Sequence, residues 1–323
     1  MSKSANNDIM VAISVPPFWH CGRTIRGNSI YTLIALAPAM LAAFAIWGIP
    51  AIRVVALSVF TAMACEFLCQ KAMGQKPSQS DGTAAVLGVL FAFLLPAAAP
   101  WWLVVIGVGC AMCLGRMAFG GYGTNPVSAV LVGWALVFVS FPTYMDATST
   151  ILLTDLCDPL LRLKQFGPAA VADMSYADLL LGLQLGGLGA SQVGLLCLGG
   201  LFIILRGVIR WEVPLCFLLG VAVTAACFQF ADSARYAGPL FHLCSGTTVL
   251  AAFFLATEDS CSPHRRLPMC LYGLTGGALV SSSFPTFAPS QNKKSPSRIY
   301  FLRRRFFQRP KTHVTHCTSI ATY

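Results

Sequence analysis

The stretch 117–136, MAFGGYGTNPVSAVLVGWAL, combines permissive and polar residues between two long apolar runs. Its candidate ligand-contacting residues are Gly120, Gly121, Gly123, Thr124 and Asn125. Glycine lets the backbone approach a ligand closely, and the Thr and Asn side chains supply directed hydrogen bonds. A second interpretation is a helix connection, with Asn125 as the N-cap and Pro126 at the first helical position. The two interpretations are compatible.

Other residues that could do chemistry lie within apolar runs. Cys110 and Cys113 form a CxxC motif, which suggests either a metal or redox pair or small packing residues. A single CxxC without a second pair favours packing. His242, in LFHLCSG, is interpreted either as a proton relay or as a paired structural histidine. Glu66 is interpreted as an interfacial carboxylate paired with Lys71.

The composition predicts an integral membrane protein. Of the 323 residues, 56% are hydrophobic and 11% charged, whereas soluble domains are about 25% charged. A membrane-spanning helix needs about 20 apolar residues. The predicted spans are 30–49, 51–68, 83–96, 101–117, 126–141, 179–205, 213–230 and 239–257, and a ninth begins at 269 and is cut off at 280. The third is short, as is typical of a re-entrant segment. The expected fold class is an all-α polytopic bundle.

These spans suggest five regions. They are a cytoplasmic N-terminal segment (1–28) with no cleavable signal peptide, a first half of five spans (29–142), an outside loop (143–176), an incomplete second half (177–280) and a tail (281–323). Lys and Arg in the loops fall mainly on the side that holds the N-terminus, which the positive-inside rule assigns to the cytoplasm.

The tail has a composition of its own. It carries eight Lys and Arg residues and no acidic residue, and it interrupts the apolar run LYGLTGGALV. We expect it to be the product of a reading-frame error or a truncated gene; the alternative is a polybasic segment that binds anionic lipid or nucleic acid. No nucleic-acid partner is expected.

Two stretches resemble each other, GTAAVLGVLFAF (82–93) and GTTVLAAFFL (246–255). Weak likeness between halves is typical of internally repeated membrane folds, although two glycine-started apolar helices can also be alike by chance. Both stretches have polar flanks, and LGGLGASQVG (185–194) is a third polar, glycine-rich break. Such breaks predict a buried polar site or close helix packing through small residues.

Taken together, these pieces resemble a known family. QKPSQSDGTAAVLGVLFAFLLPAAAPWW, FGGYGTNPVSAVLVGWALVFVSFP, GGLGASQVGLLCLGGLFIILRGVIRWEVP and GPLFHLCSGTTVLAAFFLATEDSCSP are similar to segments of the D subunit of Rnf ion-translocating electron-transport complexes. They are more distantly similar to the B subunit of the sodium-pumping NADH:quinone reductase. The tail does not share this similarity.

The resemblance implies two related five-helix halves, with a bound flavin through which electrons pass. It implies FMN, with riboflavin as a further candidate, and electron flow from ferredoxin or NADH coupled to Na⁺ or H⁺ translocation. The chain would be an enzyme only within a complex of several subunits in the bacterial inner membrane. The five residues of 120–125 named above would then line the flavin site or seal the fold around it.

The resemblance also implies FMN joined through its phosphate to a threonine of the outside loop, within Asp-Ala-x-Ser-Gly-Ala-Thr-Pro-Leu. The loop here reads MDATSTILLTDLCDPLL, and alignment on either end puts Leu152 or Asp158 at the threonine position. Neither forms a stable phosphoester. Thr150 is the nearest substitute, with Thr154 as a second candidate; a noncovalent flavin is the alternative.

Two rival functions remain open. Repeated membrane folds with glycine-rich breaks also suit a passive channel or solute transporter, and the tail suits a non-functional truncated subunit. A flavin-bearing preparation would favour the electron-transfer subunit over both.

Overall fold

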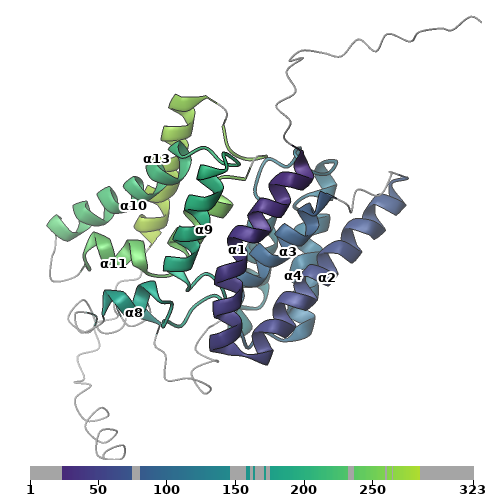
Figure 1. The fold of residues 1–323 in the computed structure, drawn as a ribbon, viewed down its shortest axis with the longest axis horizontal. Coiled ribbons are helices and arrows are strands. Elements are labelled where there is room, and N and C mark those ends of the chain that lie inside the picture. Colours follow the sequence, from purple (N-terminus) through teal and green to yellow (C-terminus); the bar gives the residue numbers. More distant parts are fainter. Residues whose placement is uncertain are drawn as a thin grey trace, which may run out of the picture. The chain divides into compact units, whose positions relative to one another are not determined.

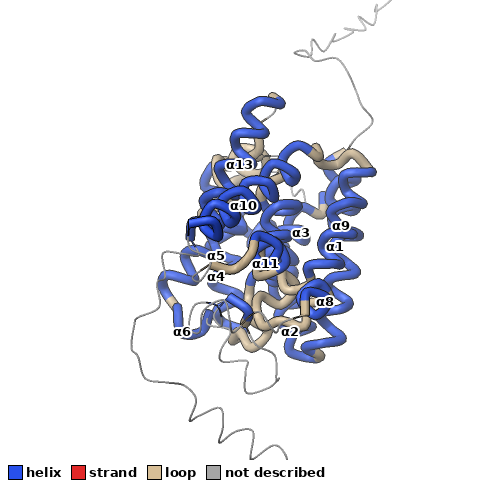
Figure 2. The backbone as a smooth tube through the Cα atoms, turned by 90° about the vertical axis from the view of Figure 1, so that its left-hand side faces the viewer, coloured by secondary structure: helices blue, strands red, loops and turns tan. Residues whose placement is uncertain are grey.

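The computed structural model describes residues 24–74, 81–145, 158–160, 163, 171, 175–231, 236–258, 260–263 and 265–283. Thr150, Thr154, Leu152 and nearly all of the predicted tail lie outside these residues. The described part is helical and contains no strand (Figure 2). Four of its helical segments have the length and hydropathy of membrane spans: Ile25–Trp47, Ile49–Ala72, Trp101–Phe119 and Glu212–Ala231. The predicted all-α membrane fold is confirmed.

The first group of helices follows the predicted spans closely. Its elements are α1 (Ile25–Trp47), α2 (Ile49–Ala72), α3 (Thr83–Leu94), α4 (Trp101–Cys113), the 3₁₀ turn η2 (Met117–Phe119), α5 (Ala129–Ser140) and α6 (Pro142–Met145). Thr24 caps α1 by accepting a hydrogen bond from the backbone N–H of Gly27. The helix α3 is only 12 residues long and almost entirely buried, so protein rather than lipid surrounds it.

The second group departs from the predicted spans. Its elements are α8 (Tyr176–Leu180), α9 (Val193–Leu205), α10 (Glu212–Ala231), α11 (Pro239–Cys244), α12 (Thr248–Leu250), the π-helix η5 (Ala251–Leu255) and α13 (Arg266–Ser283). The prediction of one continuous span over 179–205 was wrong, because 181–192 is not helical. The span 239–257 is likewise interrupted, between α11 and α12. The helix α13 runs three residues past the predicted stop at 280, so the expected tail boundary falls inside a helix.

Two helices join the groups at their centre. Figure 1 shows α1 beside α9, with α2, α3 and α4 on one side and α10, α11 and α13 on the other. Gly199 of α9 faces the backbone carbonyl of Ala35 in α1, and a Cβ there would overlap it. In the second group, Gly273 and Gly277 of α13 form a GxxxG pattern against the backbone of α10. Small residues at these crossings let helix backbones touch, as is common in membranes.

Backbone groups of the irregular segment 181–192 form hydrogen bonds with the end of α3. The N–H groups of Leu188 and Ala190 donate to the carbonyls of Leu95 and Phe93, at 2.8 and 3.3 Å. Gly189 lies flat against the Phe93 ring, where a Cβ would overlap it. Non-helical backbone at membrane depth requires such protein partners, and here the end of α3 supplies them.

A buried glutamine links this segment to the second break. The amide nitrogen of Gln184 donates to the carbonyls of Ser191 and Cys244, at 3.0 and 3.3 Å. Each of the two GT turns noted in the sequence has a left-handed glycine, Gly82 (φ 70°) and Gly246 (φ 67°). The internal repeat itself stays a prediction.

Candidate functional site

A buried ion pair lies where three elements of the first group meet. Glu66 lies near the end of α2, Arg116 follows α4, and Thr83 begins α3. The Arg116 Nη2 atom is 3.7 Å from Glu66 Oε1 and donates a 2.6 Å hydrogen bond to Thr83 Oγ1. The two charged side chains are 5% and 3% exposed. The predicted pairing of Glu66 with Lys71 was therefore wrong, and Lys71 is exposed.

Arg116 retains unused binding capacity. Its guanidinium carbon lies 4.8 Å from the centre of the Tyr122 ring, a cation–π distance. Its Nε atom is buried and has no hydrogen-bond partner among the described residues. A buried donor normally has a partner, so a ligand or water is expected beside this atom.

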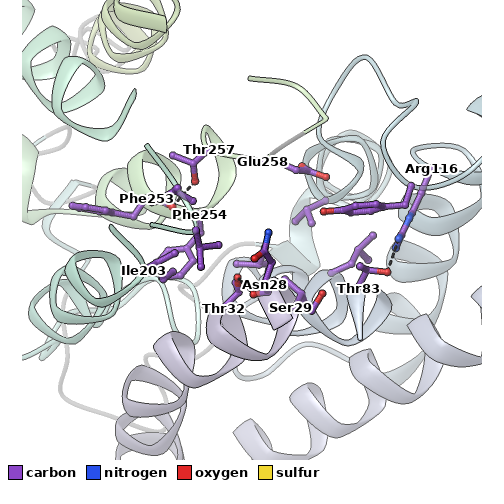
Figure 3. Close-up of a pocket in the computed structure, with 17 residues that line it drawn as sticks. Asn28, Ser29, Thr32, Thr83, Arg116, Ile203, Phe253, Phe254, Thr257 and Glu258 are labelled. Carbon is purple, nitrogen blue, oxygen red and sulfur yellow. Dashed lines mark hydrogen bonds between the residues drawn. The ribbon is translucent and has the colours of Figure 1, made fainter. Parts of the chain in front are cut away.

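A cavity opens at this point. Its volume of about 780 Å³ includes the open space at its mouth. Figure 3 shows Thr83 and Arg116 on one side and Ile203, Phe253 and Phe254 on the other. The α1 residues Asn28, Ser29 and Thr32 lie between these walls, and Thr257 and Glu258 complete the polar lining. One wall thus comes from each helix group.

The glycine-rich stretch lies beside this cavity, but its predicted residues do not line it. Gly120, Gly121 and Gly123 have φ values of 103°, 117° and 90°, which explains why glycine occupies these turn positions. Gly120, Gly123 and Thr124 are exposed. The stretch contributes Tyr122 to the lining instead. Sequence reasoning missed Tyr122 and Arg116, although both lie within or next to the stretch that it selected.

Asn125 connects the two helix groups. Its side chain is 3% exposed. The amide nitrogen donates to the Val127 carbonyl at 3.0 Å and lies 3.9 Å from the Cys261 sulfur. The predicted N-cap role was wrong, since α5 begins at Ala129 after Ser128. The contact instead brings the glycine-rich stretch to the TEDSCSP segment, which carries Glu258 into the cavity.

The environment of Cys261 favours its thiol form. Burial raises the pKa of Cys261, and the charge of Glu258 raises it further. A hydrogen bond from Ser260 acts in the opposite direction. No three His, Cys, Asp or Glu side chains gather as a metal site in the part of the chain that the structure describes.

The described end of the loop 143–176 contacts the second GT turn. The backbone N–H of Leu160 donates to Asp158 Oδ1 at 2.9 Å. The Leu160 side chain packs beside Gly246, 2.9 Å from where a Cβ would stand. Asp158 thus shapes a local turn. His242, nearby in α11, is buried and packs edge-on against Phe241.

The fold and the site define a polytopic helical membrane protein with a cavity between two helix groups that is lined by charged and aromatic residues. Residues 12–282 match the NQR2, RnfD, RnfE family, and the chain belongs to this family. It is 32% identical over 279 residues to the D subunit of the Na(+)-translocating ferredoxin:NAD(+) oxidoreductase complex of Acetobacterium woodii, covering 85% of each chain.

Two further relatives agree. The chain is 32% identical over 248 residues to the D subunit of the ion-translocating oxidoreductase complex of Alcanivorax borkumensis, covering 69% of this chain and 72% of the relative. It is 32% identical over 267 residues to the protein of the same description from Halorhodospira halophila, covering 72% and 74%. The family resemblance seen in the sequence is confirmed.

Proposed function

We propose that this chain is the membrane subunit that carries electrons through a flavin in an Rnf-type, ion-translocating oxidoreductase complex. Membership of the family and the descriptions of its relatives support the complex. The other subunits of that complex are its partners. Nucleotide and ferredoxin chemistry would belong to them, because the sequence contains no dinucleotide-binding motif.

The residue types that line the cavity support a noncovalent flavin, FMN or riboflavin, as the proposed ligand. An isoalloxazine is flat, with an apolar benzene edge and a polar pyrimidine edge. Phe253 and Phe254 provide an apolar, aromatic wall, and Arg116 provides a charge and an unpartnered N–H on the opposite side. The hydroxyls of Thr32 and Thr257 suit a ribityl chain. A bound flavin would supply one- or two-electron transfer.

Within this site each protein group has a definite task. Arg116 would hold the pyrimidine edge and stabilise negative charge on a reduced ring, since buried cations stabilise nearby anions strongly. Glu66 would keep the guanidinium charged and oriented through their 3.7 Å contact. The buried, paired charge of Arg116 in the cavity lining is the observation that carries this proposal.

The test is the noncovalent flavin content of the purified complex. Arg116→Met should reduce the flavin released by denaturation at least severalfold. Arg53→Met is the matched control, because Arg53 is exposed and lies outside the cavity lining. Unchanged release of flavin from Arg116→Met, in a complex that still assembles, would contradict the site. A complex with no flavin of any kind would support the channel instead.

The covalent flavin is a separate proposal. Thr150, with Thr154 as the second candidate, would carry FMN on the outside loop. Fluorescence of the denatured chain on a gel, followed by peptide mass, tests it. A fluorescent band with FMN mass on one of these threonines supports the proposal, and a dark band contradicts it while leaving the cavity proposal intact.

The orientation is also proposed. The loop charges support a bacterial inner-membrane location with the N-terminus in the cytoplasm. The cavity would then open on the cytoplasmic side, because Asn28 and Ser29 at the start of α1 line it. A cysteine introduced at Asn28 should react with a membrane-impermeant maleimide only after the cells are opened. Labelling from outside intact cells would reverse this orientation.

A further inference from the structure

Two thiols from different helices touch at the ends of α2 and α4. The sulfur atoms of Cys69 and Cys113 are 3.6 Å apart. Cys113 is exposed and Cys69 is half-exposed. The sequence motif pairs Cys113 with Cys110 within one helix, whereas the tertiary structure pairs it with a cysteine 44 positions earlier in the chain.

The contact is close to what a covalent bond requires. A disulfide has its sulfurs about 2.05 Å apart, so bonding needs a small approach of two side chains at helix ends. Cys113 is the last residue of α4, and Cys69 lies in the final turns of α2. Helix ends adjust more readily than helix centres.

We propose that Cys69 and Cys113 form a reversible disulfide that ties the end of α2 to the end of α4. The oxidant class is a low-molecular-weight disulfide such as oxidised glutathione. The exposed Cys113, as thiolate, attacks one of its sulfurs and releases one reduced glutathione. Cys69 then attacks the Cys113 sulfur and releases the second, so that two S–H bonds are lost and one S–S bond passes to the protein.

A disulfide at this position would lie close to the buried ion pair of Glu66 and Arg116. Glu66 lies three residues before Cys69, and Arg116 lies three residues after Cys113. The disulfide would therefore fix the separation of the two helices that carry the buried ion pair. The charge pattern predicts the cytoplasmic face for these helix ends, where disulfides are usually transient and regulatory. The proposal does not depend on a bound flavin.

The test uses the full chain in its purified complex. The complex is treated with oxidised glutathione, remaining thiols are blocked with N-ethylmaleimide, and the unreduced digest is mapped by mass. We expect a linked peptide pair containing Cys69 and Cys113, lost on reduction, with two fewer alkylated thiols per chain. Separate maleimide or glutathione adducts on the two residues, with no linked pair, would overturn the proposal.

Cysteine-to-serine variants identify which two residues form the disulfide. Cys110→Ser is the matched control and should leave the linked pair unchanged, whereas Cys113→Ser should abolish it. A pair that links Cys69 to Cys110, or one that persists in Cys113→Ser, would contradict the assignment. The wild-type measurement decides the proposal even where a variant assembles poorly.

Discussion

Arg116 concentrates the unusual chemistry of this molecule in one residue. It is buried, it is held by Glu66 and Thr83, and it contacts the Tyr122 ring. A buried charge is costly unless it is paired, and breaking such a pair leaves the remaining charge uncompensated. The side chains around Arg116 therefore maintain a charge that packing alone would exclude.

The first prediction concerns the partner of this charge. Glu66→Gln should destabilise the protein by about 3 kcal/mol, because Arg116 remains charged without its carboxylate. Thermal unfolding in detergent measures the loss. The double variant Glu66→Gln with Arg116→Met should recover part of it, and a double variant less stable than Glu66→Gln alone would contradict the pairing.

The second prediction concerns Cys261. Because burial and the Glu258 charge raise its pKa, its thiolate should form only at a higher pH than in an unstructured peptide. Alkylation of native protein should therefore rise at higher pH at Cys261 than at the same residue in denatured protein. Peptide mass across a pH series measures both profiles, and identical profiles would contradict the environment described.

Among the helices, those of the second group are separated by non-helical segments that pack against other parts of the protein. The segment 181–192 satisfies its backbone on the end of α3, and this requires Gly189 to lie on the Phe93 ring. Phe93 is fully buried, so its ring has nowhere to move. Glycine here serves close approach rather than flexibility.

The third prediction tests this contact. Gly189→Ala should destabilise the protein by about 1–3 kcal/mol, the usual cost of overpacking. Gly186→Ala is the matched control, since a Cβ there meets nothing within 4 Å. The melting temperatures of the two variants in detergent are compared. Equal values would contradict the tight contact and show that the Phe93 ring can move aside.

At the scale of the whole described bundle, the two helix groups meet at α1 with α9 and again at Asn125 with Cys261. The second contact joins residues 136 positions apart in sequence. It places Tyr122 from one group and Glu258 from the other around a single cavity.

The fourth prediction tests that junction. Asn125→Cys should form a disulfide with Cys261 within one chain under mild oxidation, since the present side chains are 3.9 Å apart. A linked peptide pair in the unreduced digest is the measurement. Thr124→Cys is the control, because Thr124 is exposed and its hydroxyl donates to the Gly121 carbonyl within its own turn; equal linkage from it would contradict the geometry.

The candidate site was only partly predictable. The glycine-rich stretch was identified because its residue types are unusual between apolar runs, yet its glycines form an exposed turn. Tyr122 and Arg116 line the cavity, and their role depends on Glu66, Thr83 and residues of the second group. No local pattern encodes such distant neighbours.

The membrane class, the family and the long helices α1, α2 and α10 were all predictable from the amino-acid sequence. The membrane class and the helices follow from length and apolarity, which are local properties set by the thickness of the bilayer. The family follows from the resemblance of the four segments quoted above. The sequence also marked the glycine-rich break at 185–194. How this break is stabilised, which charges pair and which thiols touch became clear from the tertiary structure. Breaks such as 181–192 are stable only when another segment satisfies their backbone, and that segment is more than 80 residues away in the chain. Pairing and cavity shape likewise come from packing between distant segments.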